Sequence, residues 1–244
     1  MKIIIEQSYQ DMSKKAANDV LKMVDGLKKK PVLCTASGDS PAGLYEELAR
    51  RISGENRDIA GWQFVGLDEW LHMNGNDEGS CRFHLNNQLF RPLKVKEENI
   101  GFFDGRAKDP EVECERIEQF IKAHQGIDIA IVGLGMNGHI GMNEPGTSHY
   151  LHSHVSDLAE QTIQTGQKYF KEATPLSKGL TLGIANLMEA RQVILVVSGS
   201  KKGAIVKQVL EGKISEELPA SLMRNHKHFT VYLDAAAARY LQAE

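Results

Sequence analysis

The sequence predicts an α/β fold in which a single domain, residues 1–244, forms a doubly wound, mainly parallel sheet with helices on both faces. Short apolar segments of strand type alternate with segments of helical period along the whole chain. This alternation is typical of a parallel sheet with crossover helices. A length of 244 residues allows one large domain or two small ones. One domain is the simpler interpretation, because no repeat, flexible linker or abrupt change of charge divides the chain.

Each expected element follows from the spacing of apolar residues. Strands are expected at 3–5, 32–35, 64–67, 127–132, 180–182, 193–197 and 229–233. Helices are expected at 12–27, 41–52, 112–121 and 159–170 and after Lys202. For the second of these helices, Ser40 is expected as the N-cap and Pro41 as the first helical residue. Polar or glycine-rich composition predicts loops at 74–80 and 133–145.

Composition excludes several classes of protein. Lys and Arg number 29 against 32 for Asp and Glu, so the net charge of −3 provides no basic field for nucleic acid or an anionic membrane. The start of the chain has too short an apolar run for a secretory signal, and no apolar run approaches a membrane span. Its three cysteines lack any CxxC spacing, which argues against a disulfide framework. We therefore expect a cytoplasmic protein.

The loop after the strand 127–132 contains a GxGxxG pattern at residues 133–138. A dinucleotide fingerprint needs a helix to open at these glycines, whereas Gly141 and Pro145 oppose a helix here. The acidic residue expected at the end of a second strand, about twenty positions on, is also missing. The sequence therefore does not predict a nicotinamide or flavin site.

The same loop gathers four polar residues, Asn137, His139, Asn143 and Glu144, at a strand end, which is where open parallel sheets bind ligands. A carboxylate near an imidazole can set its tautomer and raise its pKa, as in an acid/base pair. The alternative is a surface loop whose polar residues only satisfy turn geometry.

Asp68 stands at the end of another buried strand, beside Glu69. Burial and a like-charged neighbour would raise the pKa of its carboxyl, which suits a group that abstracts a proton. Alternatively, Asp68 caps the following turn.

The turn formed by Ser37, Gly38, Asp39 and Ser40 precedes a helix, whose free N–H groups and dipole attract anions. Lys202, at another junction of strand and helix, could supply positive charge. The turn is thus a candidate phosphate site. The carboxylate of Asp39 does not favour this interpretation, since it repels phosphate unless its side chain points away. The alternative is an ordinary connection with a serine N-cap.

Three histidines, His149, His152 and His154, invite a metal interpretation. Cysteine or carboxylate partners at metal-ligand spacing are missing nearby, so we expect polar loop and edge-strand residues and no metal.

Three segments resemble the signature segments of the glucosamine-6-phosphate deaminase/isomerase family, in the same order. They are residues 37–41 (SGDSP), 67–70 (LDEW) and 133–146 (GLGMNGHIGMNEPG). The resemblance extends over nearly the whole chain, including 180–183 and 199–202. Galactosamine-6-phosphate deaminases belong to this family, and 6-phosphogluconolactonases and sugar-responsive regulators share its fold more distantly.

The resemblance implies a role for each candidate residue. Asp68 would move a proton between C2 and C1 of the sugar, and His139 would open the ring with help from Glu144 and Asn137. The substrate phosphate would lie on Ser37, Gly38, Asp39 and Ser40, with Lys168 and Lys202 as cations. An amino-sugar phosphate would be the partner, with no cofactor and no metal, and the chain would be a monomer or a homo-oligomer.

Four residues depart from the usual pattern of the family: Asp39, Trp70, Cys81 and Lys168. The last three together resemble the galactosamine branch. We therefore expect galactosamine 6-phosphate as the substrate, giving tagatose 6-phosphate and ammonia. The alternatives are a glucosamine-6-phosphate deaminase giving fructose 6-phosphate, a hydrolase similar to 6-phosphogluconolactonase, and a non-catalytic sugar-phosphate sensor.

Overall fold

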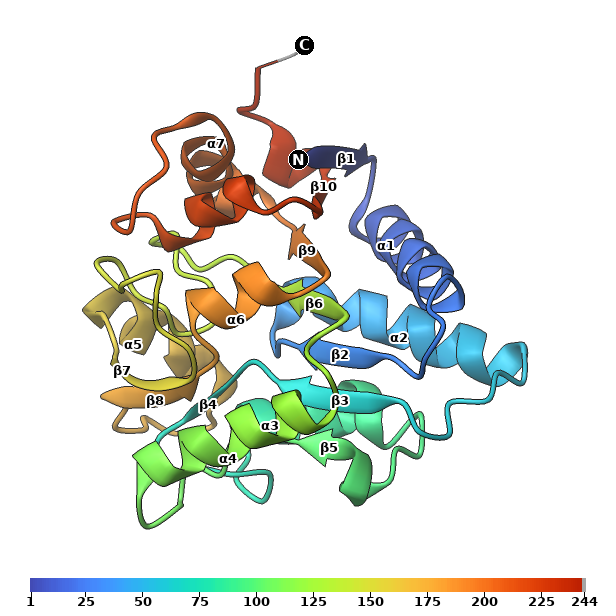
Figure 1. Ribbon diagram of the computed structural model, residues 1–244. Coiled ribbons are helices and arrows are strands. Elements are labelled where there is room, and N and C mark those ends of the chain that lie inside the picture. Colours follow the sequence, from blue (N-terminus) through green and yellow to red (C-terminus); the bar gives the residue numbers. More distant parts are fainter. Residues whose placement is uncertain (243–244) are drawn as a thin grey trace.

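A seven-stranded parallel sheet forms the centre of the protein, of which the computed structural model describes residues 1–242 (Figure 1). In spatial order its strands are β1 (Lys2–Glu6), β10 (Phe229–Asp234), β9 (Gln192–Val197), β6 (Ile129–Val132), β2 (Val32–Thr35), β3 (Gln63–Gly66) and β5 (Ile100–Gly101). Every neighbouring pair is parallel. After β2 the chain adds β3 and β5 on one side, and it then returns to add β6 on the other. The strand order therefore reverses between β2 and β6, where α/β sheets bind ligands.

Helices cover both faces of this sheet, because its central strands are apolar on both sides. In β9, Val193, Leu195 and Val197 belong to one core, whereas Ile194 and Val196 belong to the other. Helices α1 (Tyr9–Asp25) and α2 (Asp39–Gly54) pack in the second core. The first core contains residues of α4 (Pro110–Ala123), α6 (Ile184–Glu189) and α7 (Gly203–Glu211). This arrangement confirms the predicted fold class.

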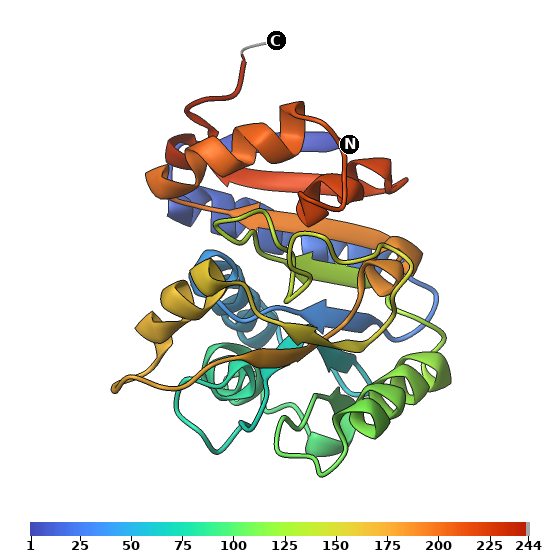
Figure 2. The same ribbon diagram turned by 90° about the vertical axis from the view of Figure 1, so that its left-hand side faces the viewer.

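A second, antiparallel sheet lies beside the first and was not predicted. It contains β4 (Asp68–Trp70), β8 (Lys178–Thr181) and β7 (His154–Asp157), with β8 in the middle. In Figure 2 its yellow and brown strands cross in front of the main sheet. The strand expected at 180–182 thus belongs to this sheet and not to the parallel one.

The start of α2 corrects one expectation. Its N-cap is Gly38 and its first residue is Asp39, so Ser40 is not the N-cap and Pro41 is not the first helical residue. Gly38 has φ 128°, a conformation that side chains disfavour and glycine allows. The Ser40 hydroxyl instead accepts the backbone N–H of Ser198 at 3.2 Å and therefore joins the first turn of α2 to the residue that follows β9.

The remaining elements are short. The helix expected at 159–170 is α5 (Glu160–Gly166) followed by a single 3₁₀ turn, η3 (Gln167–Tyr169). Sequence periodicity did not predict α3 (Cys81–Leu85), the π-helical η1 (Asn86–Phe90), the 3₁₀ turns η2 (Glu97–Asn99), η4 (Ser200–Lys202) and η5 (Pro219–Asn225), or α8 (Ala235–Ala238). Within residues 1–242 we find no helix with the length and apolarity that crossing a membrane requires.

Candidate active site

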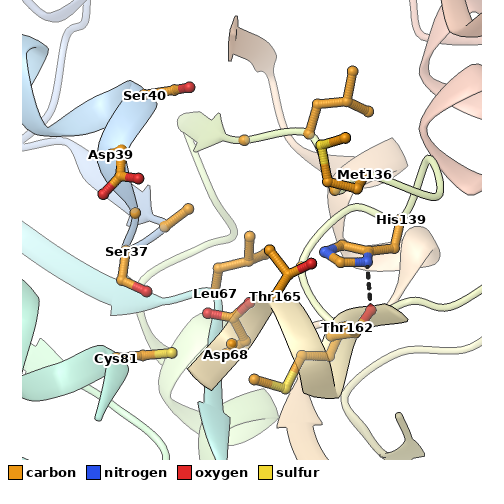
Figure 3. A pocket seen from close by; sticks show the side chains of 18 of the residues that line it. Ser37, Asp39, Ser40, Leu67, Asp68, Cys81, Met136, His139, Thr162 and Thr165 are labelled. Atoms are coloured by element: carbon orange, nitrogen blue, oxygen red, sulfur yellow. Dashed lines mark hydrogen bonds between the residues drawn. The ribbon is translucent and has the colours of Figure 1, made fainter. Parts of the chain in front are cut away.

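A cavity of about 220 Å³ opens at the carboxyl ends of the central strands. The turn after β2, the segment after β3 and the loop after β6 form its floor, and α5 with η3 lies across it. In Figure 3, Asp68 lies between Ser37 on one side and His139 on the other. Most of the predicted site residues line this cavity: Ser37, Gly38, Asp39, Ser40, Asp68, Asn137, His139, Lys168 and Lys202.

Asp68 begins β4, two residues beyond the end of β3. Its carboxyl faces the cavity and is otherwise surrounded by protein, and this burial raises its pKa to about 6. A hydrogen bond from the Cys81 thiol and the positive field of His139 act in the opposite direction but do not offset the burial. Such a carboxyl is a stronger base than an exposed aspartate.

The neighbouring carboxyl of Glu69 has a structural role. Its side chain is fully buried and accepts backbone N–H groups from Trp70, Cys81 and Arg82 at 2.9, 2.9 and 3.0 Å. These bonds join β4 to the start of α3. They therefore hold Cys81 against Asp68 in the wall of the cavity.

The loop after β6 brings His139, Glu144 and Asn137 together. Asn137 Nδ2 donates to Glu144 Oε2 at 2.7 Å, and His139 Nδ1 lies 3.5 Å from the same oxygen. His139 Nδ1 also pairs with the Thr162 hydroxyl at 3.0 Å. Burial opposes the charge of Glu144, but hydrogen bonds from His139, Thr162 and Asn137 outweigh it and hold the pKa of that carboxyl below its usual value. Glu144 is thus suited to orient the imidazole.

The glycines of this loop serve close packing. A Cβ on Gly135 would lie 2.3 Å from the His139 ring, so the imidazole rests directly on the loop backbone. Gly141 has φ 60°, and a Cβ there would lie 2.7 Å from the Thr181 hydroxyl oxygen. Asn143 donates to the carbonyls of Ile140 and Leu182, which pins the loop to the end of β8. Asn143 therefore has a structural role here.

The residues expected to hold phosphate gather at the other end of the cavity. We call the turn 37–40 together with Lys168 and Lys202 the candidate phosphate site. Lys202 Nζ donates to the Leu134 carbonyl, and burial, followed by the nearby ammonium of Lys168, lowers the pKa of Lys202 to about 8. Lys168 Nζ lies 2.5 Å from the carboxylate of Asp39. Two cations and one carboxylate thus share this end of the cavity.

Comparison with known proteins identifies the family to which this chain belongs. Residues 7–232 match the family described as glucosamine-6-phosphate isomerases/6-phosphogluconolactonase. The chain belongs to this enzyme family. Among its relatives, the glucosamine-6-phosphate deaminase of Oceanobacillus iheyensis is 37% identical over 238 residues, which are 97% of this chain and 95% of that protein. Glucosamine-6-phosphate deaminase 1 of Bacillus subtilis is 37% identical over 241 residues, 98% of each chain.

Solved structures of other proteins superpose on this chain over nearly its whole length. A monomeric glucosamine-6-phosphate deaminase superposes with a TM-score of 0.94 at 36% identity, covering 98% of this chain and 99% of the other. The 6-phosphogluconolactonase of Trypanosoma brucei superposes with a TM-score of 0.79 at 19% identity over 99% of this chain and 98% of that one, which shows a common fold.

Several further side chains, which the sequence analysis did not assign to the site, also reach the cavity. Thr162, Thr165 and Tyr169 come from α5 and η3, Ser198 from the end of β9, and Cys81 from α3. Cys81 was noted only as a departure from the family pattern. The others carry no local signal, because packing of distant segments brings them to the cavity.

The three histidines considered for metal binding have separate partners. His149 pairs with Glu216 at 2.6 Å, His152 pairs with Glu189 at 3.0 Å, and His154 Nδ1 lies 2.8 Å from the His152 carbonyl. Within residues 1–242 no group of three side chains has the arrangement of a metal site.

Proposed function

We propose that the protein is a hexosamine-6-phosphate deaminase that acts on glucosamine 6-phosphate. The observation that carries this proposal is a single cavity that combines a carboxyl of raised pKa, an imidazole oriented by a carboxylate, and the candidate phosphate site with its two lysines. Isomerisation of an aldose needs two proton-transferring groups at different positions. A phosphate far from the reacting carbons supplies binding energy that holds C2 in place.

Ring opening comes first, because the C2 proton becomes acidic only beside a free aldehyde. Thr162 and Glu144 both approach Nδ1 of His139, so Nε2 is the nitrogen left for the substrate. His139 then carries the proton between the O1 hydroxyl and the ring oxygen. Glu144 stabilises the imidazolium formed during this transfer.

Asp68 acts in the second step. Its carboxylate removes the C2 proton and returns it to C1. The amine loses one proton and O1 gains one, so that the open aldose becomes a 2-imine with a hydroxyl at C1. Water adds to this imine and releases ammonia, so that the amino-sugar phosphate and water give the 2-ketose phosphate and ammonia. Each well-placed acid or base contributes about 10²- to 10⁴-fold to the rate.

The choice of epimer differs from the expectation in the sequence analysis. Trp70, Cys81 and Lys168 suggested galactosamine 6-phosphate, but the relatives compared above are named glucosamine-6-phosphate deaminases. These deaminases, which are 36–37% identical to this chain, favour glucosamine 6-phosphate, with fructose 6-phosphate and ammonia as products. The similar solved structure is described as monomeric, so self-association of this chain stays a prediction, as does its place in the cytoplasm.

A coupled ammonia assay tests this function. We expect ammonia from glucosamine 6-phosphate with a higher kcat/KM than from galactosamine 6-phosphate. A preference for galactosamine 6-phosphate would restore the first expectation about the epimer. Acid release from 6-phosphogluconolactone without ammonia from either amino sugar would instead identify a hydrolase.

A further inference from the structure

The carboxylate of Asp39 lies where the proposed function places a phosphate dianion. Asp39 and Asp68 are the two carboxylates among the residues that line the cavity. Asp39 is the first residue of α2, and it lies between Gly38 and Ser40 in the turn 37–40. A fixed negative charge at this position repels phosphate, so the residue needs a physical explanation.

The structure shows where this carboxylate is directed. Asp39 Oδ2 accepts a hydrogen bond from Lys168 Nζ at 2.5 Å, which joins the start of α2 to η3 across the cavity. Partial burial opposes the charge of Lys168. The hydrogen bond to Asp39 and the negative charge of Asp39 act the other way, and the pKa of the ammonium lies above its ordinary value. The cation that the phosphate would use is therefore already paired within the protein.

A second contact holds Lys168 near the cavity without help from Asp39. Its Nζ lies 4.7 Å from the centroid of the Tyr169 ring, a cation–π distance. Tyr169 itself lines the cavity, and a Cβ on Gly38 would lie 3.6 Å from its hydroxyl oxygen. The ring is therefore a contact that can keep the ammonium beside the turn 37–40 without its bond to Asp39.

We propose that Asp39 is an internal competitor of the substrate phosphate, which binds Lys168 in the free enzyme and must release it when a phosphate enters. This inference rests on the proposed function, because that function places the phosphate at this site. An incoming phosphate exchanges one anionic partner of Lys168 for another. Its net gain is therefore smaller than it would be with an unpaired lysine.

The other groups near this pair do not replace either partner. Lys202 donates to the Leu134 carbonyl, and the charge of Asp39 acts on it only through space, whereas Asp39 bonds Lys168 directly. Burial lowers the pKa of His84, which packs against the Tyr169 ring, so its imidazole is uncharged at neutral pH. The Tyr9 hydroxyl donates to the backbone carbonyl of Asp39 and leaves its carboxylate free to pair.

Solvent limits the strength of the competition. The side chains of Lys168 and Asp39 are 47% and 74% exposed, and exposed ion pairs are worth little because water screens them. Replacing Asp39 with asparagine removes the charge and keeps the shape. We expect the variant to bind phosphate about 1.4- to 5-fold more tightly, because exposed ion pairs change binding by factors of this size.

Calorimetric titration with inorganic phosphate tests the proposal without requiring turnover. Asp39→Asn should bind phosphate more tightly than the unmodified protein and should show a lower KM for the amino-sugar phosphate. Asp39→Glu, which keeps the charge, should restore affinity towards that of the unmodified protein. Asp157→Asn is the matched control, because Asp157 pairs with Lys178 at 2.9 Å on the second sheet, outside the residues that line the cavity.

The outcomes separate the two proposals. Equal or weaker phosphate binding by Asp39→Asn contradicts the competition, and so does an equal gain in Asp157→Asn. Absence of phosphate binding in every variant also overturns it. Tighter binding by Asp39→Asn alone, in a protein that releases no ammonia, would support the competition and refute the deaminase function.

Discussion

The Asp68 carboxyl has neighbours that carry no charge at neutral pH. The thiols of Cys34 and Cys81 and the hydroxyl of Tyr45 lie close to it, and burial raises the pKa of all three. They therefore stay protonated and contribute no positive charge that would stabilise the carboxylate. The imidazole of His139 is the group whose positive field opposes the effect of burial on Asp68. The basicity of this single residue thus follows from its burial among uncharged groups.

This environment predicts how the rate depends on pH. The base must be ionised to act, and burial raises the pKa of Asp68 to about 6, so kcat should fall as the pH decreases through about 6. An exposed aspartate would hold its activity to about pH 4. Measuring kcat at saturating substrate separates this effect from ionisation of the substrate phosphate, which acts on KM. A kcat that stays constant from pH 7 to pH 4.5 would exclude Asp68 as a base with a raised pKa.

The second sheet determines how the elements around the cavity fit together. Strand β8 pairs with β4, which carries Asp68, and with β7, and it continues through Gly183 into α6. A Cβ on Gly183 would lie 2.0 Å from the backbone carbonyl oxygen of Leu151. A backbone atom cannot move aside as a flexible side chain can. Glycine is therefore required where β8 meets α6.

Gly183→Ala should destabilise the fold. The clash with the Leu151 carbonyl forces the backbone apart, and overpacking of this kind costs about 1–3 kcal/mol. Gly54→Ala is the matched control, because Gly54 ends α2 and a Cβ there meets no atom within 4 Å. Thermal unfolding should show a lower Tm for the first variant and an unchanged or higher Tm for the second. Equal Tm values for the two variants would mean that the junction tolerates a side chain.

Across the whole molecule, the sequence predicted those features that depend on the local pattern of apolar and polar residues. Strong apolar runs marked most strands of the main sheet, and polar residues after β2, β3 and β6 marked the floor of the cavity, because parallel strands end at one edge.

Long-range pairing was beyond the reach of local pattern. Asp68 pairs with Thr181 in the second sheet although more than a hundred residues separate them, and Thr162 and Tyr169 reach the cavity through packing alone. Ser40 was the expected N-cap of α2, but the helix begins two residues earlier than expected. Its N-cap is Gly38, a glycine with positive φ that has no side chain to signal a cap. That residues 1–244 form one domain stays a prediction.

The central claim is that Asp68 transfers the proton between C2 and C1 inside the cavity it shares with His139. Hydrogen exchange at C2 in deuterated water, followed by NMR, tests this claim most directly. We expect the unmodified protein to exchange this hydrogen, and Asp68→Asn to lose exchange while it still binds inorganic phosphate. Exchange at an unchanged rate in Asp68→Asn would contradict the claim.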